Sequence, residues 1–165
     1  MSIAVYVIDT SYLLELFRCK GFCNETASRI VHKRFKAANR AGGRFYVPLP
    51  CLFEPGNHIA DVQHDQLRLK LANDLVETVR LSLGTGKPWK VTPTGPPGEI
   101  LPSLLDRFVP LAARQRIGLV DTFTLDEACR LKQEFKAFKA RIHIWTNDRA
   151  LKGHEPDAET NPYLW

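Results

Sequence analysis

The sequence predicts an α/β fold, a three-layer α/β/α sandwich around a central parallel sheet of four to five strands. Short apolar runs rich in β-branched or aromatic residues recur along the 165 residues, and segments with helical periodicity separate them. Strands that alternate with helices in this way form a parallel sheet with helices on both faces. The length is that of one domain with a sizeable core.

The first strand is expected at residues 3–8, an almost unbroken apolar run typical of a central strand buried on both faces. It ends in Asp9-Thr10-Ser11, and a short helix is expected over residues 12–17. Parallel sheets bind their ligands at the carboxyl ends of the strands, where Asp9 would lie. The alternative is that Asp9 only caps the helix, because Asp is a good N-cap residue.

The next elements are a helix over residues 25–41 and a strand over residues 44–48, which Pro48 closes. The chain then enters a helix that runs to about residue 62. Pro55 is tolerated in a first helical turn but not in a helix interior. We therefore expect this helix either to begin near Glu54 or to have a distorted first turn.

Residues 66–83 form the clearest amphipathic pattern, with leucine or valine at every fourth position. A short strand is expected at 89–92, followed by helical residues 100–116 in which Pro110 could mark a break. A further helix begins at Asp121, and the last strong strand is 141–146. Residues 1–152 are expected to form one domain, followed by a polar tail, 153–165, that is loosely packed except for its final aromatic residues.

Four carboxylates are expected near one edge of this sheet. Asp9 and Asp148 directly follow two strands, and Glu54 lies just beyond a third. Asp121 opens the helix before the last strand, a position that topology constrains less. Two carboxylates about 4 Å apart repel by about 4 kcal/mol at an effective dielectric constant of about 20. Such a group persists if a cation binds or if some members take up protons. Ligands that are all oxygen suit Mg²⁺ or Mn²⁺.

Net charge, cysteine content and the length of the apolar runs indicate what class of protein this is. The net charge is +5, and basic residues are concentrated between Arg18 and Arg44, where they form either a solvated helix face or a phosphate-binding surface. The four cysteines include no CxxC pair and suit reduced cytosolic thiols. No apolar run has transmembrane length and nothing marks export. We expect a cytoplasmic protein without membrane association.

The order of these motifs resembles the PIN domain, and more narrowly the VapC-type toxin ribonucleases of toxin–antitoxin pairs. The resemblance spans residues 3–151 and is carried by Val-Ile-Asp9-Thr-Ser11, Glu54, Leu-Val-Asp121-Thr and Trp-Thr-Asn-Asp148-Arg. It implies an α/β/α sandwich and Mg²⁺- or Mn²⁺-dependent endonucleolytic cleavage of RNA. The catalytic and metal-binding residues would be Asp9, Glu54, Asp121 and Asp148. Ser11 matches a hydroxyl residue that supports the first Asp.

This resemblance leads to a specific expectation, hydrolysis of RNA by a metal-activated water. Thr146 and Asn147 are candidates for supporting roles around the carboxylates. A toxin would also be a homodimer with a small antitoxin as its partner. Six basic residues are candidate contacts to the RNA backbone: Arg18, Lys20, Lys33, Arg34, Lys36 and Arg149.

Two other functions remain open from the residues. The family runs its Glu in a smooth helix, whereas Glu54 is followed by Pro55, which motivates a catalytically impaired PIN-fold domain that binds RNA or protein. The second alternative function is that of a phosphoryl-transfer protein with another doubly wound fold. A haloacid-dehalogenase-like hydrolase would need Asp where Ser11 stands, and a receiver domain would need lysine where Arg149 stands. Both differences argue against it.

Overall fold

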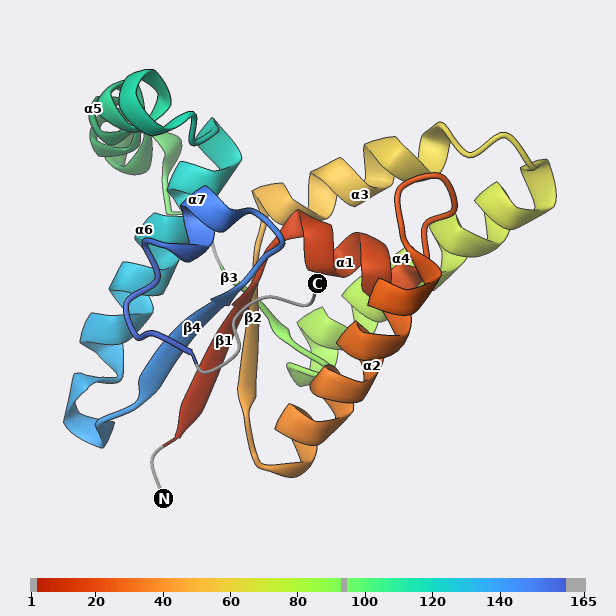
Figure 1. Ribbon diagram of the computed structural model, residues 1–165, viewed down its shortest axis with the longest axis horizontal. Helices are drawn as coiled ribbons and strands as arrows, with labels where there is room; N and C mark the ends of the chain where they lie inside the picture. Colours follow the sequence, from red (N-terminus) through yellow and green to blue (C-terminus); the bar gives the residue numbers. More distant parts are fainter. Residues whose placement is uncertain (1–2, 93–94, 160–165) are drawn as a thin grey trace.

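The structure, a computed structural model, describes residues 3–92 and 95–159 (Figure 1). It confirms the predicted sandwich. Its sheet has four strands, all parallel, in the order β3-β2-β1-β4. The strands are β1 (Ala4–Ile8), β2 (Arg44–Pro48), β3 (Lys90–Thr92) and β4 (Arg141–Trp145).

Strand β1 is central, as its apolar sequence predicts. Val7 pairs with Tyr46 of β2 on one side and with Ile144 of β4 on the other. Val5 and Val7 are completely buried because helices cover both faces of the sheet. All the strands run in one direction, so their carboxyl ends share one edge, at the top of Figure 1. The segments that follow β1, β2 and β4 therefore start at this edge.

One face of the sheet is covered by α6 (Leu119–Glu134), and α5 (Pro97–Gln115) packs against α6. Leu125 and Leu131 of α6 pack against Ile144 and its neighbours in one buried cluster. The short η1 helix (Lys136–Phe138) connects α6 to β4 at the amino edge of the sheet. Helix α5 is continuous through Pro110, so the break that the proline could have marked does not occur.

The other face is covered by α1 (Thr10–Phe17), α2 (Glu25–Arg40), α3 (Pro50–Ala60) and α4 (Asp65–Thr85). Their shared core includes Tyr12, Val31 and Trp145, and the rings of Tyr12 and Trp145 stack with centroids 5.4 Å apart. Among residues 3–92 and 95–159, no helix combines the length and the apolarity needed to cross a bilayer.

Helix α3 departs from the expected boundary. It begins at Pro50, so the expectation of a start near Glu54 is wrong. The fixed φ of Pro50 suits a first helical turn, and this earlier start places Pro55 inside the helix. Pro55 has no N–H to donate to the carbonyl four residues earlier, yet the helix continues to Ala60. Glu54 consequently lies in the second turn.

The tail is more ordered than expected up to residue 159. After α7 (Arg149–Lys152), the chain runs beside β4, the edge strand of the sheet. The Asp157 carboxylate accepts the N–H of Ile142 (2.7 Å), and the Glu155 carboxylate accepts the N–H of Ile144 (3.0 Å). Edge-strand N–H groups need partners, and here side chains supply them. The expectation of loose packing is wrong for 153–159, and the final aromatic residues lie outside the described residues.

Candidate metal centre

Asp9 follows β1 directly and is 5% exposed. It occupies the N-cap position of α1, but its side chain makes no capping hydrogen bond, so capping does not explain this carboxylate. Its Oδ2 accepts hydrogen bonds from the hydroxyls of Thr146 (2.9 Å) and Ser11 (3.1 Å). Burial raises the pKa of Asp9, and the hydrogen bonds it accepts, led by that of Thr146, oppose this only in part.

The two hydroxyls also fasten the end of β1 to the end of β4. Ser11 Oγ accepts the backbone N–H of Asn147 (3.0 Å), and Thr146 Oγ1 accepts that of Asp148 (3.0 Å). Each hydroxyl thus donates to Asp9 and accepts from the turn after β4. Ser11 and Thr146 occupy the supporting positions that the sequence predicts, and Asn147 takes part through its backbone. This network holds Asp9 in one orientation.

Glu54 lies at the same edge despite the proline that follows it. Its carboxylate accepts a hydrogen bond from the hydroxyl of Thr10, the residue after Asp9. Helix α3 therefore carries Glu54 to the amino end of α1. Pro55 is buried and does not turn Glu54 away from the group.

Two further side chains at this edge were not predicted from the sequence. The Cys51 thiol lies 3.8 Å from Asp9 Oδ1 and 3.3 Å from the hydroxyl of Thr124. Burial, followed by the charge of Asp9, raises the pKa of Cys51, which keeps it a neutral thiol. A helical signal existed, since Cys51 lies three residues before Glu54 and Thr124 lies three residues after Asp121.

Asp121 lies in the first turn of α6 and is half-buried, and its Oδ2 accepts the N–H of Gly118 (3.1 Å). Burial and the charge of Asp9 raise its pKa to about 6, against the lowering effect of the Gly118 hydrogen bond. The charges of Asp148 and Glu54 add to the rise. The charges of all three other predicted carboxylates therefore act on Asp121. The four side chains lie in one region of negative potential.

Asp148 is the solvent-exposed member of the four. It caps α7, and its Oδ1 accepts the N–H of Leu151 (3.0 Å). Solvent exposure thus increases across the group, from the buried Asp9 through the half-buried Asp121 to the exposed Asp148. A ligand could reach it from solvent without unfolding the sheet edge.

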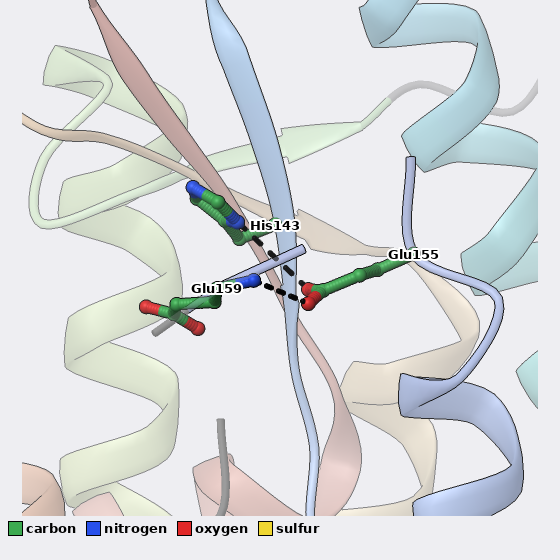
Figure 2. A group of neighbouring side chains, drawn as sticks. All are labelled: His143, Glu155 and Glu159. Atoms are coloured by element: carbon green, nitrogen blue, oxygen red, sulfur yellow. Dashed lines mark hydrogen bonds and ion pairs between the residues drawn. The ribbon is translucent and has the colours of Figure 1, made fainter. Parts of the chain in front are cut away.

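A different group brings three potential ligands closest together. Within the described residues, His143, Glu155 and Glu159 place ligand atoms within 4.8 Å of one another (Figure 2). However, the Lys152 ammonium lies 2.8 Å from Glu155 and 2.9 Å from Glu159, and it is 3% exposed. A lysine cation thus already pairs with the two glutamates of this group. Sequence reasoning missed this group because it attributed these glutamates to a loose tail.

The donor set at the carboxyl edge fits a hard cation. Its members are carboxylates, with hydroxyls around them. Burial raises the pKa of Asp121, and the negative charges of the other carboxylates raise it further. Among the described residues, no three of the four predicted carboxylates bring ligand atoms within 4.8 Å of one another. Mg²⁺ does not require this, because it keeps several waters and binds through one or two carboxylates. The residues present therefore suit Mg²⁺ or Mn²⁺.

The six basic residues predicted to contact RNA include one that already pairs within the protein, Arg34, and five that are exposed. Arg34 forms an ion pair with Glu159, donates to the hydroxyl of Tyr12 (2.9 Å) and lies over the ring of Trp145 (5.1 Å). It holds the tail and the core together, and its guanidinium is already engaged. Arg149 is exposed and follows Asp148. The remaining four, Arg18, Lys20, Lys33 and Lys36, are exposed around α2.

Comparison of the chain with protein-family models finds no matching family, and comparison with curated proteins finds no match. What the chain does is therefore inferred from its own residues.

Proposed function

We propose that this chain is a metal-dependent endoribonuclease that hydrolyses RNA phosphodiester bonds at the carboxyl edge of its sheet. The observation that carries the proposal is the raised pKa of Asp121, caused by burial and by the charges of Asp9, Asp148 and Glu54. Four carboxylates held together at a ligand-binding edge are unfavourable for folding and favourable for a divalent cation.

Asp9, Asp121 and Asp148 would hold Mg²⁺ or Mn²⁺, and Glu54 would hold a second ion or orient the attacking water. A bound cation of this kind lowers the pKa of a bound water and stabilises charge on phosphate oxygens. Ser11 and Thr146 fix Asp9 through Oδ2, and Thr10 fixes Glu54. Since the pKa of Asp121 is about 6, this carboxylate is mostly ionised at pH 7 and is lost as a ligand below pH 6.

Substitution of Asp9 by Asn tests the proposal. The variant keeps the shape of the side chain, so it should fold with an unchanged circular dichroism spectrum. Cleavage of a labelled RNA in Mg²⁺ or Mn²⁺ should fall by about a thousandfold, because a principal charged ligand is lost. Asp61→Asn, an exposed change at the end of α3, is the matched control and should cleave like the wild type. Wild-type rates in Asp9→Asn would refute the proposal.

A finer version of the proposal is a cytoplasmic toxin that forms a homodimer and is silenced by an antitoxin. The observation that favours a protein partner is an apolar groove of about 340 Å³ beside Asp121, lined in part by Leu101, Leu119 and Val120. Leu101 and Leu119 are 44% and 40% exposed. Light scattering should give twice the chain mass, and growth arrest on expression should require Asp9.

The alternative of a catalytically impaired domain loses the observation that favoured it. It was motivated by Pro55, but Glu54 reaches Thr10 with the proline in place. Binding of RNA without cleavage by the wild type in both Mg²⁺ and Mn²⁺ would restore it.

A further inference from the structure

We propose that a basic groove on α2 is an exosite that binds the phosphate backbone of the RNA at a distance from the carboxylates. This inference rests on the proposed function, because it assigns RNA as the substrate. The groove has a volume of about 430 Å³, and we name it the α2 groove. Six side chains with basic groups line it: Arg18, Arg29, His32, Lys33, Lys36 and Arg40.

The helix itself creates this groove. Arg29, Lys33, Lys36 and Arg40 recur at spacings of four, three and four residues, which places them along one face of α2. The opposite face carries Val31, which packs in the core. Arg18 is brought to the groove by the left-handed turn that ends α1, where its φ is 51°.

The groove holds a clear excess of positive charge, and Glu25, one helical turn before Arg29, is the acid that lies near it on α2. Within residues 3–92 and 95–159, none of the arginines and lysines that line the groove forms an ion pair. The neighbouring Glu15 is buried and instead accepts the hydroxyl of Ser28 (2.5 Å) and the N–H of Asn24 (3.1 Å). Like charges three and four residues apart destabilise a helix, so a bound polyanion would relieve this repulsion.

The lining favours a nucleic acid over an acidic protein. Neighbouring positions on a helix face are about 5–6 Å apart, so several cations follow one another along the groove. Among the residues that the structure describes, Ala37 is the only apolar one that lines it. Protein interfaces depend on buried apolar or aromatic anchors, whereas single-stranded nucleic acids are held by positive grooves that follow the backbone.

The position of the groove predicts how it acts. Asp9 precedes α1 and Arg18 follows it, so nine residues at about 1.5 Å each separate Asp9 from the Arg18 end of the groove by about 14 Å. From there α2 runs toward the amino edge of the sheet (Figure 1). At about 3.4 Å per nucleotide of stacked strand, an RNA bound at the carboxylates needs about four nucleotides to reach the groove. The exosite therefore strengthens binding of longer RNAs only.

The test measures RNA binding by fluorescence anisotropy in EDTA, in the Asp9→Asn background so that no RNA is cut. Single-stranded RNAs of about 20 and about 3 nucleotides are compared, on either side of the reach of the groove. Without a substitution in the groove, the longer RNA should bind more tightly. Lys33→Ala with Lys36→Ala should remove much of that gain, weakening the longer RNA roughly tenfold at 0.1 M salt and reducing the salt slope by about 1.4.

Lys136→Ala with Lys139→Ala is the matched control, because it removes the same charge from exposed residues at η1, between α6 and β4. It should leave the gain with length intact. An equal loss in both double variants, or no loss in the groove variant, would overturn the exosite. Binding of poly-glutamate as tightly as RNA of equal charge would also overturn it. RNA binding is measured without metal and without cleavage. The binding experiment can therefore support or overturn the exosite even if the cleavage assay refutes the nuclease proposal.

Discussion

Two groups of carboxylates, one at the carboxyl ends of the strands and one beside β4, differ in their electrostatics. The edge group, Asp9, Glu54, Asp121 and Asp148, lies where the strands end. The tail group, Glu155, Asp157 and Glu159, lies along the edge strand. Burial raises the pKa of Asp121 to about 6, and the other carboxylates contribute to the rise. In the tail group, the pKa values of Asp157 and Glu159 are lowered.

The difference follows from the partners of each group. Burial alone would raise the pKa of Glu159, but hydrogen bonds and charges from Arg34 and Lys152 hold it below its ordinary value. Asp157 behaves likewise, because the N–H of Ile142 and the Lys132 ammonium outweigh its burial. In the edge group, Asp121 instead faces other carboxylates.

The tail carboxylates have a structural role, whereas the edge carboxylates are the ones that we propose to bind a cation. The tail carboxylates are paired with lysine and arginine and satisfy the N–H groups of β4. The edge carboxylates repel one another, which costs stability in the absence of a cation. Each expectation below perturbs one of the two groups, from the largest effect to the smallest.

Lys152→Met should be the most destabilising single change. It leaves the Glu155 side chain, 6% exposed, without its ammonium partner and takes from Glu159 one of its two cationic partners, the other being Arg34. Breaking a buried pair in this way costs about 3–5 kcal/mol. The melting temperature at pH 7 should fall by about 10 °C. The loss should shrink as the pH falls through 4.5, the ordinary pKa of Glu159, because Glu159 then becomes neutral in the variant. An unchanged melting temperature would mean that Lys152 is dispensable.

Mn²⁺ or Mg²⁺ should stabilise the wild type through the edge group. At a concentration of 100 times its dissociation constant, a bound ion adds about 2.7 kcal/mol, and EDTA should reverse the gain. The measurement is the melting temperature against metal concentration. Asp9→Asn should abolish the gain and Glu159→Gln should keep it. The opposite pattern would assign the cation to the tail group.

Asp121→Asn should raise stability in the absence of metal while removing activity. It relieves repulsion and can still accept the Gly118 N–H, so we expect a gain of about 1 kcal/mol, or about 3 °C, at pH 7.5. The folded pKa of about 6 exceeds the ordinary 3.8, so ionisation costs the wild type stability as the pH rises between these values. The gain should vanish below pH 3.8. A lower melting temperature at pH 7.5 would contradict the repulsion.

Lys132→Ala should have the smallest effect. The ion pair between Lys132 and Asp157 is partly exposed, with side chains 37% and 23% accessible. Pairs of this kind contribute about 0.2–1 kcal/mol. Chemical denaturation should show a loss within that range that is reduced at high salt. A loss as large as that of Lys152→Met would remove the distinction between buried and exposed pairs in the tail.

The sequence alone determined the sheet and the chain positions of the edge group. Strand β1 was evident from its apolar run, and parallel topology placed Asp9, Glu54 and Asp148 at one edge. These features depend on local pattern and strand order, which can be read from residue types. Asp121 was also identified, although topology left its edge open.

Only the tertiary structure decided which side chains meet across long sequence separations. Thr10 meets Glu54, Cys51 meets Asp9, and Arg34 pairs with Glu159 rather than facing solvent with Lys33 and Lys36. Residues 153–159 lie beside β4, but their sequence does not show the apolar alternation of a strand. They contact β4 partly through carboxylate side chains that accept its N–H groups. Apolar periodicity predicts which face of a helix or strand is buried. It does not predict which distant polar side chain will pair with a buried charged residue.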